Sequence, residues 1–119
     1  MPITKTNPQW RAQTQLVRGG THRSEFAETN EAIFMTSGYV YETAEQAQRA
    51  FREEEERFIY SRFSNPTVGM FEERMQLLEG ANSCRATATG MAAVWGTLAA
   101  CLKAGDRLVA SRSLFGSCH

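Results

Sequence analysis

The chain has 119 residues, 42% of them hydrophobic and 22% charged, which fits one small globular domain. Its 13 basic and 13 acidic residues cancel, so we expect no nucleic-acid partner, because phosphate backbones select basic faces. No apolar run reaches the ~18 residues of a membrane span and the start has no apolar signal-peptide core, so we expect no membrane partner and a cytoplasmic location.

The first 57 residues are predicted to form an N-terminal arm with one helix, which docks on another subunit. Residues 1–20 are polar and contain two prolines and the pair Gly19-Gly20, a composition typical of an arm rather than a packed element. Trp10 is the exception, because an aromatic side chain in an arm usually docks on a surface, here that of another subunit. Residues 21–30, rich in Thr, Ser, Glu and Asn, predict a loop.

The helix of the arm is predicted from its start signal. Thr43 with Gln46 three residues later fits a capping box, and residues 44–57 are rich in helix formers. An apolar run at 32–35 predicts a short strand or extended segment before it. The consecutive glutamates 53–56 offer either a cation site or a solvated helix face. We expect the solvated face and no metal, because the rest of the chain offers no partner ligands.

A second helix is predicted over residues 67–79. Pro66 disfavours helix at the residue before it, so the helix is expected to start afterwards, with Thr67 as its cap. Gly80 closes it. Three apolar residues recur at i, i+4 and i+7 and predict one buried stripe: Phe71, Met75 and Leu78.

A strand–helix–strand unit follows, which makes the predicted fold class α/β. Strands are expected at about 84–88 and 107–111, and an Ala-rich helix at about 91–103, closed by Gly105, joins them. At Gly90 the unit turns from strand to helix. Such a corner presents free backbone N–H groups and the positive end of the helix dipole, and therefore binds phosphate.

Two explanations stay open for the corner at Gly90, and two for the pair Tyr60 and Arg62. Gly90 and Met91 can bind phosphate through their amides, or the glycine can serve only a tight turn, and the Thr89 hydroxyl fits either a phosphate or a helix cap. Tyr60 and Arg62 share one face of an extended backbone, where a phenol and a guanidinium suit a phosphate. Without further context, a surface arginine beside a half-buried tyrosine is the simpler explanation.

The last candidate side chains lie in or near the second half of this unit. Phe115 follows the second strand on the ligand side, where its ring either stacks on a flat ligand or anchors the loop. The three cysteines are an odd number without C-x-x-C spacing, so neither a disulfide framework nor a zinc site is expected. Cys84 and Cys101 are predicted to be buried thiols. For Cys118, beside His119, a reactive thiol stays open.

Five stretches, in one order, closely resemble the Cys/Met-metabolism pyridoxal-phosphate enzymes, a family that includes cystathionine γ-synthase, cystathionine lyases and methionine γ-lyase. They are Tyr60-Ser61-Arg62-Phe63-Ser64-Asn65-Pro66-Thr67, Glu79-Gly80-Ala81, Thr87-Ala88-Thr89-Gly90-Met91-Ala92-Ala93, Gly105-Asp106-Arg107-Leu108 and Leu114-Phe115-Gly116. The resemblance runs from about residue 14 to the end. It implies fold type I, the aspartate-aminotransferase architecture, with the truncated beginning of the cofactor-binding large domain at residues 58–119.

The resemblance also implies a role for each candidate site residue. The amides of Gly90 and Met91, with Thr89, would bind the phosphate of pyridoxal 5'-phosphate within one subunit. Tyr60 and Arg62 would reach the cofactor phosphate of the neighbouring subunit. The implied partner is therefore a second copy of the chain in a homo-oligomer, usually a tetramer of two active dimers.

The implied reaction is a γ-replacement on a small amino-acid substrate. Phe115 would stack on the pyridine ring at a position where most of the family carries Tyr, which puts in doubt any step that needs a phenol there. This departure and three further stretches favour the sulfhydrylases that make homocysteine from O-succinylhomoserine and sulfide in methionine biosynthesis: Leu16-Val17-Arg18-Gly19-Gly20-Thr21, Met35-Thr36-Ser37-Gly38-Tyr39-Val40-Tyr41 and Ser111-Arg112-Ser113-Leu114-Phe115-Gly116-Ser117-Cys118.

Other functions remain open. Within the family they are cystathionine γ-synthase, O-acetylhomoserine sulfhydrylase and methionine γ-lyase; outside it, a non-catalytic phosphate- or nucleotide-binding module, or an oligomerisation segment. The residues present are not expected to catalyse alone. Lys5 lies in the polar arm, Lys103 lies at the far end of the Ala-rich helix, and Asp106 precedes a strand. The Schiff-base lysine and an aspartate for the pyridinium nitrogen are therefore expected beyond His119.

Overall fold

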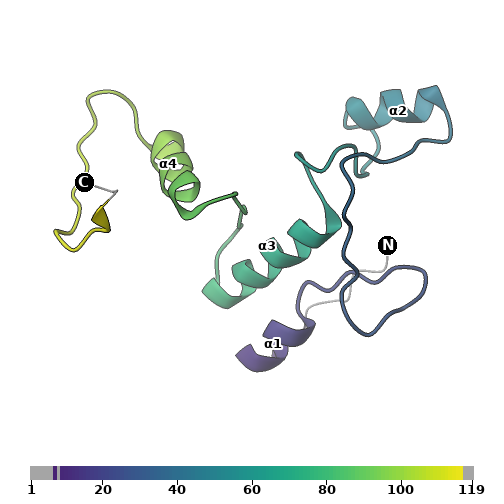
Figure 1. Cartoon of the computed structure of the whole chain (residues 1–119), viewed down its shortest axis with the longest axis horizontal. Helices are drawn as coiled ribbons and strands as arrows, with labels where there is room; N and C mark the ends of the chain where they lie inside the picture. The colour runs from purple at the N-terminus through teal and green to yellow at the C-terminus, as the bar shows by residue number, and fades with distance from the viewer. Residues whose placement is uncertain (1–6, 8, 117–119) are drawn as a thin grey trace. The chain divides into compact units, whose positions relative to one another are not determined.

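The structure, a computed structural model, describes residue 7 and residues 9–116, so the predictions for Lys5, Cys118 and His119 lie outside it. The described residues contain four helices: α1 (Ala12–Arg18), α2 (Ala44–Phe51), α3 (Pro66–Glu79) and α4 (Gly90–Cys101) (Figure 1). They fall into two units, the first ending at Ala86 and the second beginning at Thr87. None of these helices is long and apolar enough to cross a bilayer.

Helix α1 corrects the prediction that residues 1–20 form an unpacked arm. It packs on α3, and the chain leaves it through Gly19 and Gly20, which are both buried. The Arg74 guanidinium of α3 donates from Nε to the Gly19 carbonyl oxygen at 3.2 Å. Thr21, only 3% exposed, completes the contact. A seven-residue helix is marginal alone, so α3 supplies the stability that local propensity could not indicate.

Helix α2 confirms the predicted cap but is shorter than the predicted 44–57. The Thr43 hydroxyl accepts from the Gln46 amide at 3.1 Å, and the Gln46 side chain accepts from the Glu42 amide at 2.9 Å. The helix ends at Phe51, and Glu53 has a left-handed φ of 59°. The glutamate run explains the early end, because its negative charges oppose the negative end of the helix dipole.

Helix α3 begins one residue earlier than predicted, with a different cap. The Asn65 side chain accepts from the Thr67 amide at 2.9 Å and from the Val68 amide at 3.4 Å, and Pro66 occupies the first turn. The Thr67 hydroxyl is used elsewhere, as the acceptor of the Phe34 amide at 2.9 Å. At the other end Gly80 has a φ of 60° and closes the helix as predicted.

The predicted buried stripe on α3 is wrong. Phe71 is 52% exposed and Leu78 36% exposed, whereas Met70 is 2% exposed. The face that packs against the rest of the first unit therefore runs through Met70, Arg74 and Leu77, at i, i+4 and i+7. It is one position out of register with the predicted stripe, and one helical position turns the face by about 100°.

The second unit contains the predicted helix but not the predicted strands. α4 closely follows the expected range, and the Thr89 hydroxyl caps it by accepting from the Ala92 amide at 3.1 Å. Gly105 does not close it. With a φ of 95° it instead belongs to the turn in which the Asp106 amide donates to the Lys103 carbonyl oxygen at 3.1 Å.

Within the described residues there is no strand, so the α/β class is not observed here. Segments 84–88 and 107–111 make no ladder; Val109 is 96% exposed, and the Ala86 amide donates to a Glu72 carboxylate oxygen at 2.8 Å. A strand forms only where a neighbour takes its backbone groups. For the same reason Cys84 is half-buried and Cys101 exposed, which corrects their predicted burial.

Candidate functional site

The loop before α3 presents a cationic side chain against two aromatic rings, whose centres lie 6.4 Å apart in an edge-to-face contact. The Arg62 guanidinium carbon lies 5.4 Å from the centre of the Tyr60 ring and 5.5 Å from that of Phe63. Tyr60 is 41% exposed and Phe63 70% exposed, and Arg62 is exposed. Cation–π contacts of this kind hold a guanidinium in place while its N–H groups stay open to a ligand. The structure thus brings Tyr60 and Arg62 together, as a shared phosphate-binding face requires.

This loop is fixed to the segment that precedes α2. Tyr60 pairs with Gly38 in an isolated antiparallel bridge, and the Ser61 amide donates to the Ser37 carbonyl oxygen at 2.9 Å. The Ser61 hydroxyl also donates to the Thr36 carbonyl oxygen. The predicted extended backbone at Tyr60 and Arg62 is wrong: the Tyr60 carbonyl oxygen accepts from the Phe63 amide at 2.9 Å and from the Ser64 amide at 3.2 Å, so residues 61–63 form a turn. The Ser61 hydroxyl faces the 36–38 segment, whereas Tyr60 and Arg62 are exposed.

The second part of the site is the start of α4. Gly90 is the first residue of the helix, as predicted. The first-turn amide of Ala92 is taken by the Thr89 hydroxyl, but no described residue accepts a hydrogen bond from the Gly90 amide. A Cβ atom added at Gly90 would meet nothing within 4 Å, so the space above the helix start is open. This corner has the donors and the dipole that a phosphate needs.

The remaining candidate, Phe115, is not joined to that corner by any contact of the described residues. Its side chain is 79% exposed and makes no ring contact within the described part of the chain. Thr89, Gly90 and Met91 are brought together by the helix start. Arg62 belongs to the first unit and Gly90 to the second, so the geometry between them stays a prediction.

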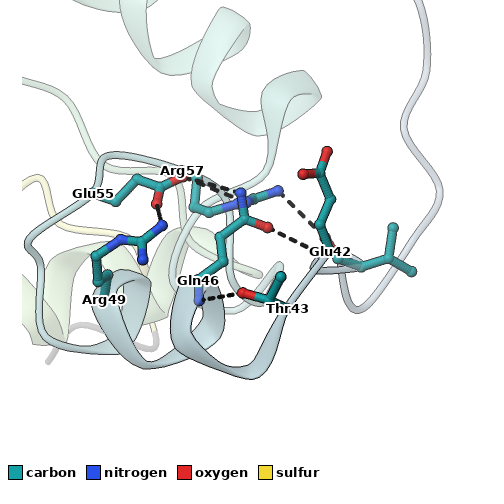
Figure 2. Close-up of polar contacts among 7 residues, drawn as sticks. Glu42, Thr43, Gln46, Arg49, Glu55 and Arg57 are labelled. Carbon is teal, nitrogen blue, oxygen red and sulfur yellow. Dashed lines mark hydrogen bonds and ion pairs between the residues drawn. The ribbon is translucent and has the colours of Figure 1, made fainter.

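Glu55, one of the consecutive glutamates 53–56, forms ion pairs with two arginines. The Glu55 carboxylate accepts from Arg49 at 3.2 Å, lies 3.5 Å from an Arg57 nitrogen, and accepts from Gln46 at 3.4 Å (Figure 2). The Arg57 guanidinium also lies over the Tyr41 ring, 5.1 Å from its centre. No group of three or more His, Cys, Asp or Glu in the described ranges could hold a metal ion. The glutamate therefore ties the end of α2 to the chain beyond it.

Sequence reasoning gave no role to one residue of the site, Asn65. It is 7% exposed and its amide group joins the loop to both α3 and the segment before α2. An asparagine directly before a proline at a helix start is a capping signal that the sequence does carry. Its hydrogen bond to the Phe34 carbonyl oxygen could not be predicted from the local sequence, because that acceptor lies 31 residues earlier.

Comparison with known proteins shows that the chain is similar to members of one enzyme family. The family model for Cys/Met metabolism PLP-dependent enzymes matches residues 13–119. An O-succinylhomoserine sulfhydrylase of Mycobacterium tuberculosis (strain ATCC 25618 / H37Rv) is 60% identical over 102 residues, covering 86% of this chain and 25% of the relative. One from Pseudomonas aeruginosa is 45% identical over 104 residues, covering 87% and 26%.

A relative with another activity is less similar. The L-methionine gamma-lyase of Porphyromonas gingivalis is 36% identical over 103 residues, which cover 87% of this chain and 26% of the relative. The chain spans about a quarter of the length of each of these curated relatives.

Proposed function

The chain belongs to the Cys/Met metabolism PLP-dependent enzyme family, and we propose that it is the N-terminal part of an enzyme that converts O-succinylhomoserine and sulfide to homocysteine and succinate. The observation that carries this choice is the ranking of the relatives by their sequence identity to the chain. Relatives named O-succinylhomoserine sulfhydrylase are 60% and 45% identical to the chain, and a methionine gamma-lyase is 36% identical.

The cofactor phosphate is proposed to bind at the start of α4. The residues present fit the group: the Gly90 amide has no acceptor among the described residues, the space above it is open, and the dipole of a 12-residue helix points toward it. Met91 would add a second amide, and the Thr89 hydroxyl, which already caps the helix, would border the phosphate. The described residues leave room for a Cβ atom at Gly90, so they do not themselves require a glycine there. We therefore attribute the glycine to close approach of the phosphate.

Tyr60 and Arg62 are proposed to complete a neighbouring subunit's phosphate site. Both side chains are exposed, and the guanidinium lies against the adjoining rings of Tyr60 and Phe63. A planar guanidinium binds phosphate oxygens in pairs, and a phenol adds one donor. The active unit would then be a dimer, assembled into a homotetramer in the cytoplasm, with residues 1–57 as the docking arm.

Bound pyridoxal phosphate would supply the electron sink for loss of protons from Cα and Cβ of the amino acid, while succinate leaves Cγ and sulfide adds there. This chain's residues would bind and orient. Phe115 would lie against the cofactor ring and has no hydroxyl to move a proton. Segments 84–88 and 107–111 would pair as strands within the fold type I sheet, which the rest of the large domain, from residue 58 onward, completes.

The lysine that bonds the cofactor is proposed to lie beyond residue 119. Lys103 is two residues past the end of α4, and its amide donates to the Asp106 carboxylate at 3.0 Å. The 12 residues of α4 rise about 18 Å at 1.5 Å per residue, so Lys103 stands at the opposite end from Gly90. Neither Lys103 nor Asp106 can therefore serve a cofactor whose phosphate is held at Gly90.

The test is turnover by the full-length protein loaded with pyridoxal phosphate. Homocysteine from O-succinylhomoserine and sulfide, measured by mass spectrometry, should form faster than from O-acetylhomoserine. Cystathionine formed from cysteine in preference to sulfide would instead identify a cystathionine γ-synthase, and methanethiol released from methionine a methionine γ-lyase. Absence of all four activities with nucleotide binding, or with self-association alone, would contradict the proposal.

A further inference from the structure

We propose that Asn65 is a positioning residue for Arg62: its side-chain amide sets the loop that presents Tyr60 and Arg62 to the cofactor phosphate. This inference rests on the proposed function of that loop and goes beyond it. Asn65 itself would touch neither the cofactor nor the substrate. It would act through Ser61, the residue between the two phosphate-binding side chains.

Asn65 is almost completely buried, and both ends of its amide have partners. It is 7% exposed. Its oxygen caps α3 by accepting from the Thr67 amide at 2.9 Å. Its nitrogen donates to the Phe34 carbonyl oxygen and to the Ser61 hydroxyl, both at 3.0 Å. One side chain therefore joins three parts of the first unit: the start of α3, the loop, and the segment before α2.

The hydrogen bond to Ser61 determines which way the loop faces. Ser61 is held on its other side by the 36–37 segment, since its amide donates to Ser37 and its hydroxyl to Thr36. Ser61 is the first residue of the turn that the Phe63 and Ser64 amides close on the Tyr60 carbonyl oxygen, and within this turn the Arg62 guanidinium lies over the Tyr60 ring. Loss of the Asn65 nitrogen would release Ser61 and, with it, the turn that brings Tyr60 and Arg62 together.

Such positioning matters because Arg62 is exposed and its side chain is long. An exposed arginine that must be ordered on binding loses rotamer freedom, and this loss weakens the complex. Anchoring of the loop backbone, together with the contact of the guanidinium with the adjoining rings of Tyr60 and Phe63, removes part of that loss before the phosphate arrives. Asn65 therefore contributes to cofactor affinity without a contact of its own.

The capping and positioning roles can be separated by chemistry. Aspartate and serine are good helix caps, so Asn65→Asp and Asn65→Ser keep an acceptor for the Thr67 amide. Neither has the amide nitrogen that donates to Phe34 and Ser61. Ser61→Ala removes the loop side of the same hydrogen bond and leaves the cap untouched. Asn82→Asp makes the same chemical change as Asn65→Asp at an exposed position and is the matched control.

The experiment measures the dissociation constant of pyridoxal phosphate for these variants of the full-length protein, and amide hydrogen exchange of residue 61 in its cofactor-free form. We expect Ser61→Ala to weaken binding by about fivefold, the loss of the Asn65–Ser61 hydrogen bond. Asn65→Asp and Asn65→Ser should weaken it at least as much, because they also lose the hydrogen bond to Phe34. Exchange at residue 61 should become faster, and Asn82→Asp should match the wild type. Combined with Arg62→Ala, Asn65→Ser should add no further loss, because its effect passes through Arg62.

The result that would overturn the inference is unchanged affinity in Asn65→Ser and Ser61→Ala while Arg62→Ala binds the cofactor more weakly; the proposed function would then stand. A full additive loss in the double variant would also overturn it, because Asn65 would then act independently of Arg62. Unchanged affinity in Arg62→Ala alone would remove the phosphate role of Arg62, and the inference with it.

Discussion

A single methyl group at Gly19 should loosen α1 from α3. The backbone of Gly19, with a φ of −68° and a ψ of 141°, accepts any residue, so only space is at issue. An added Cβ would lie 2.6 Å from the Gln15 carbonyl oxygen and 2.7 Å from Leu77 Cδ1. The leucine can rotate, but the carbonyl belongs to the α1 backbone and can yield only if the end of the helix moves.

Overpacking of this kind costs about 1–3 kcal/mol. At about 1.4 kcal/mol per factor of ten, Gly19→Ala should increase amide exchange in residues 12–18 of the full-length protein by about 5- to 140-fold. The control is Gly69→Ala in α3, where a Cβ meets nothing within 4 Å. That change should slow exchange in α3, since alanine is favoured over glycine in a helix by about 0.5–1 kcal/mol. Unchanged exchange of α1 in Gly19→Ala would refute the reasoning.

Three further predictions concern charges and caps. The hydrogen bond from Arg74 lowers the pKa of Glu31 below its ordinary value of 4.5. The pair therefore stabilises the folded state above pH 4.5, and this contribution is lost as the pH falls through the lowered pKa. Glu31→Gln should flatten the acid side of a plot of unfolding free energy against pH. Thr89→Val should destabilise α4 by about 1 kcal/mol, seen as faster amide exchange at Ala92, whereas Thr89→Ser should not. Glu55→Gln should lower unfolding stability by less than about 1 kcal/mol, since Glu55 is one-third exposed and its partner Arg49 half exposed, so that water screens the pair.

The existence and the approximate starts of the helices that carry local capping signals could be predicted from the sequence. α2 and α4 begin after threonine caps, and α3 begins at the proline of an Asn-Pro pair, one residue before the predicted start, and ends at a glycine with positive φ. These signals act within three or four residues, so they can be recognised without the rest of the fold. The start of a helix at Gly90 could be predicted for the same reason.

What depends on distant residues could not be predicted. α1 is short and is held by Arg74, some sixty residues later, and the packed face of α3 is decided by where α1 lies. The two expected strands have the right composition but no neighbour to pair with among the described residues. The second role of Asn65 likewise depends on Phe34, which no local pattern connects to it.

The most direct measurement of the central claim is the structure of the full-length protein crystallised with pyridoxal phosphate. We predict that phosphate oxygens lie about 2.7–3.2 Å from the Gly90 and Met91 amides of one subunit, and that Arg62 of the neighbouring subunit donates to the same phosphate. A phosphate bound away from the start of α4, or an Arg62 that points into solvent in every subunit, would contradict the account.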